Sequence, residues 1–151
     1  MTDHASTTQP VQIYSAAARA FHWLTALGIA MLIASGLWMT ARSDANIWDA
    51  TTNALYSGHK LLGFVVLWLV VARLVYRLVR GAPDDAPSLS PAQRVISHVV
   101  HWSLYGLLLM IPILGWLGVS AFPALTVFGI FDLPSIAAVD QAQAKQYFEW
   151  H

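Results

Sequence analysis

The sequence contains no cysteine at any of its 151 positions. It can therefore form neither a disulfide nor an iron–sulfur or other thiolate metal site, so a tightly held metal would depend on histidine. The chain also lacks a basic run that alternates with aromatic residues, and its formal net charge is zero with histidine neutral. For these reasons we expect no nucleic acid among its partners.

Charged side chains are scarce. They make up 11% of the residues, against 57% that are hydrophobic, whereas an ordinary soluble domain has roughly 25% charged residues. Three apolar segments, at about 16–39, 55–79 and 92–121, are long enough as helices to cross a hydrocarbon layer of about 30 Å. This composition indicates that the chain has a bilayer as its solvent.

Proline and glycine mark the limits of the third helix. The run 81–87 contains two prolines and cannot continue the second helix, whereas Ser90-Pro91-Ala92-Gln93 is typical of an N-cap with proline at the first helical position. Within the third span, Pro112 with Gly115 and Gly118 predicts a kink and close contacts with neighbouring helices.

Beyond the third span the sequence is less regular. Residues of about 122–141 form a loop rich in aromatic and branched side chains, which we expect at the membrane interface or over the end of the bundle. Residues 142–151 have the pattern of the first turns of a fourth helix. The predicted fold is all-α, a transmembrane helix bundle with three complete spans and the beginning of a fourth.

Basic residues near the span ends predict the orientation of the chain. Five lie on the side of the N-terminus and three on the opposite side. The five are Arg19, Arg73, Arg77, Arg80 and Arg94, and the three are Arg42, Lys60 and Lys145. This excess predicts an N-terminus in the cytoplasm. We expect a polar cytoplasmic tail over residues 1–13 and a membrane domain over residues 14–151.

Histidines near the span ends fall into two layers. His22 and His101, with His98 one turn away, lie on the side of the N-terminus, and His59 and His151 lie on the other. Ionisable side chains in lipid-spanning helices are costly and usually functional. Bundles build cofactor sites from side chains at equal depth on facing helices, as His59 and His151 are expected to be. Haem held by two histidines has no open iron position, which favours electron transfer.

Several of these residues also have simpler interpretations. A histidine at a span end can be an interfacial residue bonded to a lipid headgroup or a carbonyl, and this stays open for His98 and His101. Arg19 precedes His22 by three residues and shares its helix face. There it would either pair with a haem propionate or anchor the span at the membrane surface.

Four groups of motifs along the chain together resemble one known family. They are Ala20-Phe21-His22-Trp23-Leu24, Gly58-His59-Lys60-Leu61-Leu62-Gly63 with Arg73-Leu74-Val75-Tyr76-Arg77, His98-Val99-Val100-His101-Trp102-Ser103-Leu104-Tyr105, and Val127-Phe128-Gly129-Ile130-Phe131-Asp132-Leu133-Pro134. Their order and spacing resemble the bacterial cytochrome b561 family, which is related to the cytochrome b subunits of nickel hydrogenases and formate dehydrogenases. The resemblance covers nearly the whole chain after about Tyr14. It implies a four-helix inner-membrane bundle with two b-type haems, whose ligands come from helices one, two and four.

Carried onto this chain, the resemblance implies that His22 holds the cytoplasmic haem, while His59 and His151 hold the outer one. Family members continue helix four to a second histidine that should partner His22, and the sequence ends before that position. We therefore expect a chain truncated at the start of the fourth helix. Such a chain would complete the outer site alone, unless His101 substitutes as the inner ligand.

Three functions are compatible with these features. The first is a haem b-binding protein that passes electrons between the quinone pool and an outer-face redox partner, with His98 and His101 as candidate neighbours of the quinone. The second is a superoxide:quinone oxidoreductase, which the net negative charge of the expected outer segments disfavours. The third is a haem-free transporter or scaffold. We favour the electron carrier over a stand-alone oxidoreductase, and we leave a homodimer open.

Overall fold

A computed structural model of the chain describes residues 15–81 and 89–151. Helix α1 spans Ala16–Asp44, α2 spans Ala50–Arg80, α3 spans Pro91–Ala121 and the short α4 spans Gln141–Trp150. The three long helices are apolar and long enough to cross a membrane. The predicted all-α bundle is confirmed. The expected polar tail over 1–13 and most of the connection over 81–87 lie outside the described residues.

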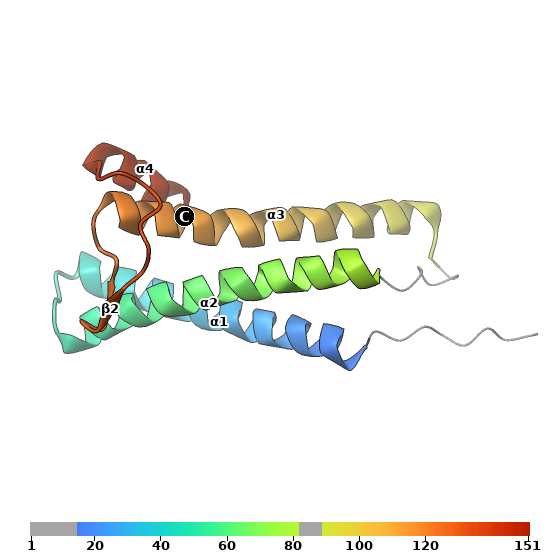
Figure 1. The fold of residues 1–151 in the computed structure, drawn as a ribbon, viewed down its shortest axis with the longest axis horizontal. Coiled ribbons are helices and arrows are strands. Elements are labelled where there is room, and N and C mark those ends of the chain that lie inside the picture. Colours follow the sequence, from blue (N-terminus) through green and yellow to red (C-terminus); the bar gives the residue numbers. More distant parts are fainter. Residues whose placement is uncertain (1–14, 82–88) are drawn as a thin grey trace, which may run out of the picture.

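The long helices lie side by side along the length of the molecule (Figure 1). Helix α2 packs against both α1 and α3, and α4 packs against α3. The α1–α2 connection, α4 and the two short strands gather at one end, which we call the hairpin end. The start of α1, the end of α2 and the start of α3 lie at the other, which we call the N-terminal end (Figure 1).

Each helix begins at a side chain that accepts hydrogen bonds from the first turn. Ser15 caps α1, Asp49 caps α2 and Asp140 caps α4. Helix α3 starts with a full capping box, in which Ser90 and Gln93 each accept a hydrogen bond from the backbone of the other. The N-cap predicted at Ser90 is therefore confirmed, with proline at the first helical position as expected.

Helices α1 and α2 extend further at the hairpin end than the apolar segments predict. Helix α1 ends at Asp44 rather than near residue 39, and α2 begins at Ala50 rather than near residue 55. Hydropathy marks only the part of a helix that lies in hydrocarbon, whereas a capped helix continues into the polar layer. Arg42 stabilises this connection, because its Nη2 lies 2.6 Å from the Asp49 carboxylate and its Nε donates to Thr52 Oγ1 at 2.8 Å.

The segment predicted as a loop over 122–141 contains a small β-hairpin that the sequence pattern did not predict. Strands β1 (Thr126–Val127) and β2 (Phe131–Asp132) pair antiparallel. Between them Phe128 and Gly129 both have positive φ, at 50° and 70°, as in a type I′ turn. The Phe128 N–H donates to Ser57 Oγ at 3.1 Å, so the hairpin is fastened to α2 and covers that end of the bundle.

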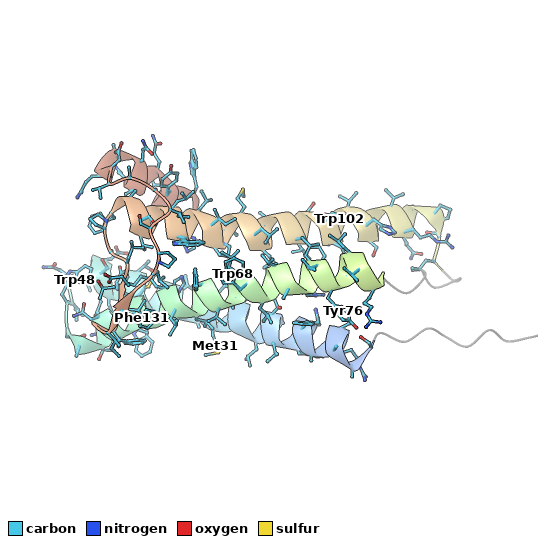
Figure 2. All side chains as sticks on the ribbon, in the orientation of Figure 1. Met31, Trp48, Trp68, Tyr76, Trp102 and Phe131 are labelled. Carbon is cyan, nitrogen blue, oxygen red and sulfur yellow. The ribbon has the colours of Figure 1, made fainter. Side chains whose placement is uncertain are left out.

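Large apolar side chains cover much of the surface of the long helices. Figure 2 shows Met31, Trp68 and Trp102 among them, and these are exposed to 52%, 54% and 52%. The buried cluster between the helices is small and centres on Val66 and Val70. A surface of this kind is unfavourable in water and suits contact with lipid tails.

Candidate functional site

His59 and His151 meet at the hairpin end of the bundle. His59 lies in the third turn of α2, and His151 directly follows the last residue of α4. Their ring centres are 6.0 Å apart, and the ring planes are inclined at 82° to each other. The structure thus brings together the two histidines that were expected at equal depth on facing helices.

The Nδ1 atom of His59 is held by α1. It lies 3.1 Å from Ser35 Oγ, and the Ser35 hydroxyl donates its own hydrogen to the Leu32 carbonyl at 3.1 Å. A hydroxyl that donates to Leu32 can only accept from His59, and in that arrangement the ring hydrogen would be on Nδ1 and the Nε2 lone pair would be free. The His59 ring can lie close to the backbone of α1 because Gly36 has no side chain. A Cβ at Gly36 would lie 3.3 Å from His59 Cε1.

The Nδ1 atom of His151 is held in the same way by α3. It lies 2.8 Å from the backbone carbonyl of Ile111. A carbonyl oxygen can only accept, so Nδ1 carries the hydrogen and Nε2 presents its lone pair. Neither Ser35 nor Ile111 was predicted from the sequence. Among the sequence signals, only the prediction of a kink and close contacts at Pro112, Gly115 and Gly118 pointed to this part of α3.

His59 and His151 would fit as the two residues that hold one haem iron. A bond from a metal to an imidazole nitrogen is about 2 Å long, and the ring centre lies about 1 Å behind that nitrogen. Two imidazoles that held one metal between their nitrogens would therefore have ring centres about 6 Å apart. The observed separation is 6.0 Å. Fixing Nδ1 by a hydrogen bond is also how proteins commonly orient a histidine that ligates through Nε2.

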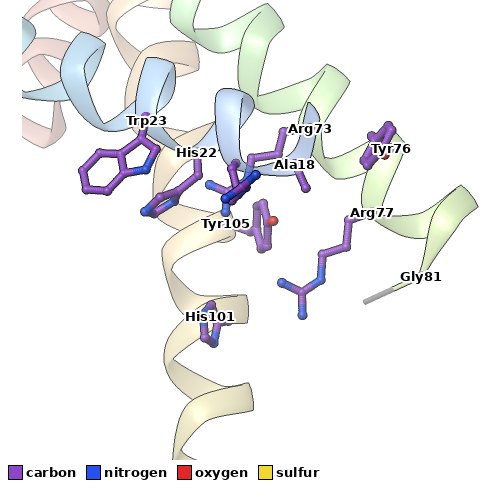
Figure 3. A pocket seen from close by; sticks show the side chains of 10 residues that line it. Ala18, His22, Trp23, Arg73, Tyr76, Arg77, Gly81, His101 and Tyr105 are labelled. Carbon is purple, nitrogen blue, oxygen red and sulfur yellow. The ribbon is translucent and has the colours of Figure 1, made fainter. Parts of the chain in front are cut away.

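A cleft of about 240 Å³ lies at the N-terminal end, between α1, α2 and α3 (Figure 3). His22 and Arg19 of α1, Arg73 and Arg77 of α2, and His101 and Tyr105 of α3 contribute to its walls. Among the described residues that line it, three are arginines and none is acidic. The cleft therefore has a positive potential suited to an anionic group.

Arginine side chains in this cleft pack on an aromatic ring. The guanidinium carbons of Arg73 and Arg77 lie 5.5 and 5.7 Å from the centre of the Tyr105 ring. Both are within the range of a cation–π contact, so the Tyr105 ring keeps two positive charges at the wall of the cleft.

The two remaining candidate histidines, His98 and His101, differ in whether they line the cleft. The ring of His101 lines the cleft together with His22, whereas His98 does not. Both form a hydrogen bond through Nδ1 with a backbone carbonyl one turn earlier in α3, His101 with Ser97 at 2.7 Å and His98 with Arg94 at 2.9 Å. Both histidines thus have the carbonyl bond expected of an interfacial residue, and they differ in that His101 also lines the cleft. The same bond leaves Nε2 of His101 available to a group in the cleft.

Similarity to known proteins extends over almost the whole chain. The family profile described as prokaryotic cytochrome b561 matches residues 13–151. Cytochrome b561 homolog 2 of Escherichia coli (strain K12) is 35% identical over 140 residues, which make up 92% of this chain and 73% of that protein. The chain therefore belongs to the prokaryotic cytochrome b561 family, and it is a bacterial membrane protein that binds haem b and transfers electrons.

Proposed function

We propose that His59 and His151 would hold a haem b at the hairpin end. The observation that carries this proposal is the separation of 6.0 Å between their ring centres, with both Nδ1 atoms hydrogen-bonded to the protein. Haem b supplies a centre that accepts and releases one electron. The chain's own contribution is to fix both imidazoles in one tautomer, so that little reorganisation accompanies a change of charge.

At the N-terminal end, His22 is the proposed ligand of a second haem. Arg19 shares its helix face and lines the same cleft, where its guanidinium would pair with a propionate. Arg73 and Arg77 add positive charge to that cleft. A partner for His22 would be His101 or a residue beyond those described.

His101 is also the proposed neighbour of a quinone. Reduction of a quinone requires protons at the head group, and a histidine whose Nδ1 is already bonded can exchange a proton through Nε2. The alternatives for His101 are therefore a ligand or a proton donor, and both would act from the wall of the cleft of about 240 Å³.

We further propose that the protein lies in the inner membrane with its N-terminus in the cytoplasm. Arg19, Arg73, Arg77, Arg80 and Arg94 all lie near the N-terminal end of the bundle, which supports this orientation by the positive-inside rule. Electrons would then pass between quinone at the cytoplasmic side and a redox partner at the hairpin end. The mass of the detergent-solubilised protein distinguishes a monomer from a homodimer.

Histidine variants test the proposed ligands. The full chain is purified with His59→Ala, His151→Ala or His22→Ala, and haem per protein is measured together with the reduced-minus-oxidised spectrum. We expect the first two variants to lose the same haem and His22→Ala to leave it in place. His98→Ala is the matched control, because His98 lies on α3 outside the cleft. Unchanged haem content in both His59→Ala and His151→Ala would contradict the proposal.

A further inference from the structure

Helix α4 rests on two glycines of α3 that are three residues apart. A Cβ built on Gly118 would lie 2.6 Å from a ring carbon of Phe148, and one built on Gly115 would lie 2.7 Å from Cε1 and 2.9 Å from Nδ1 of His151. Phe148 and His151 are also three residues apart. Phe148 of α4 and His151 at its C-cap therefore both lie directly against the backbone of α3.

The close approach at Gly115 gives His151 access to a main-chain acceptor. The Ile111 carbonyl is one helical turn before Gly115, where a side chain at position 115 would lie close to it. A carbonyl oxygen has two lone pairs, so Ile111 can accept from His151 Nδ1 in addition to a helical N–H. The bond is 2.8 Å long.

We propose that Gly115 is a positioning residue for His151, because only the absence of its side chain lets the imidazole reach the Ile111 carbonyl while its ring centre lies 6.0 Å from that of His59. This inference rests on the proposed ligation by His59 and His151. Gly115 itself touches neither substrate nor cofactor in this proposal, and it acts through the ring that lies on it.

The distances show why alanine would not be accommodated at this position. Carbon atoms in contact lie about 3.5–4.0 Å apart, whereas the added Cβ would be 2.7 Å from His151 Cε1. The ring would have to move by about 1 Å, which exceeds the ~0.5 Å tolerance of a well-built site. That movement would stretch or break the bond to Ile111.

The two glycines have different consequences for the imidazole. At Gly118 the added Cβ meets Phe148, a side chain with no polar atom to orient. At Gly115 it meets the ring that carries the proposed ligand nitrogen. A substitution at Gly118 therefore tests the packing of α4 on α3, and a substitution at Gly115 tests the position of the imidazole as well.

The test compares Gly115→Ala with Gly118→Ala and Gly106→Ala in the full chain. Gly106 lies on the same helix, and a Cβ there meets nothing within 4 Å. Each protein is purified in detergent, and haem per protein, the spin state of the oxidised haem and the midpoint potential are measured. Added imidazole then tests whether a free ligand replaces a displaced His151.

We expect Gly115→Ala to weaken haem retention at this site about tenfold, as the loss of a partner of a metal-bound histidine commonly does. The remaining haem should show a high-spin fraction that added imidazole converts to low spin. Its midpoint potential should rise, because a histidine without its Nδ1 bond is a weaker electron donor. Gly118→Ala should keep the low-spin spectrum, and Gly106→Ala should equal the unaltered protein.

Two results would overturn the proposed role of Gly115 without contradicting the proposed ligation by His59 and His151. One is a Gly115→Ala protein with unaltered haem content, spin state and potential. The other is an equal loss in Gly115→Ala and Gly118→Ala without rescue by imidazole, which would indicate helix packing alone. Failure of the ligation itself is recognised separately, because His151→Ala would then retain low-spin haem at full occupancy.

Discussion

The Nζ atom of Lys60 donates a hydrogen bond to the backbone carbonyl of Ala124 at 2.8 Å. It also donates to the carbonyl of Thr126, so one ammonium group joins α2 to the segment that enters β1. Lys60 follows His59 directly in the sequence. The hairpin is thereby fixed to the same turn of α2 that carries the proposed haem ligand.

Replacing Lys60 by methionine should loosen the hairpin. Loss of a hydrogen bond from a charged donor costs about 1.5–3 kcal/mol, so we expect a lower temperature of thermal unfolding and faster proteolysis between residues 122 and 140. The midpoint potential of the proposed haem should fall, because a nearby positive charge favours the reduced form. Lys145→Met is the control, since that side chain is 80% exposed and its distance to Glu149 is 3.8 Å. Equal effects of both substitutions would exclude a specific role for Lys60.

His101 and His98 should differ in their effect on reaction with quinol. His101 lines the cleft at the N-terminal end and His98 does not, so His101→Asn should slow reduction of the protein by quinol about a hundredfold, the usual loss for a proton-transfer group. His98→Asn should have no effect. Stopped-flow reduction followed at the haem absorbance measures both rates. If His101 is instead a ligand, the spectrum of His101→Asn will change before any quinol is added.

The sequence predicts that His59 and His151 share one end of the bundle. Successive spans run in opposite directions, so depth follows from position along each span. The partners of their Nδ1 atoms, Ser35 and the Ile111 carbonyl, could not be predicted in this way. They depend on how far each helix is rotated about its axis and on how closely two backbones approach, and hydropathy contains neither quantity.

The hairpin between α3 and α4 was missed for a related reason. Its strands are two residues long, so they are too short to show the alternation of apolar and polar residues that identifies a strand. The one local signal is the pair Phe128-Gly129, since glycine suits the positive φ of the turn. Phenylalanine at the first turn position is unusual, and its N–H bond to Ser57 supports that conformation.

The connection between α1 and α2 should become less stable in acid. The pKa of Asp49 lies below its ordinary value of 3.8, because its carboxylate accepts the Thr52 N–H and, second, is bonded to Arg42. A carboxyl with a lowered folded pKa stabilises the protein above its unfolded pKa, and this contribution is lost as the pH falls through the folded pKa. We therefore expect the stabilisation to be complete at pH 7 and to disappear only below about pH 4.

Two substitutions at Asp49 separate the cap from the ion pair. Asparagine caps a helix as well as aspartate does, so Asp49→Asn should remove only the attraction to Arg42, whereas Asp49→Ala should remove both. The difference in unfolding temperature between the unaltered protein and Asp49→Asn should be present at pH 7, should shrink in 1 M salt and should vanish at low pH. A difference that stays constant with pH would show that the charge of Asp49 does not stabilise the connection.

Close packing of α1 on α2 depends on Gly28 and Val66. A Cβ on Gly28 would lie 2.6 Å from Cγ2 of Val66, which is 2% exposed and cannot move into free space. Gly28→Ala should therefore destabilise the protein by about 1–3 kcal/mol, the usual cost of an overfilled core. Gly106→Ala, with nothing within 4 Å of its Cβ, is the control for the change in helix propensity.

The double variant decides whether this cost comes from the contact itself. Val66→Ala alone should leave a cavity, but combined with Gly28→Ala it removes the methyl group that the new Cβ meets. The two substitutions should then be less damaging together than the sum of their separate effects, by at least about 0.5 kcal/mol, as expected for residues in direct contact. Thermal unfolding of all four proteins in the same detergent gives this coupling energy. Additive effects would mean that α1 shifts to avoid the contact, and that Gly28 does not determine how closely α1 and α2 approach.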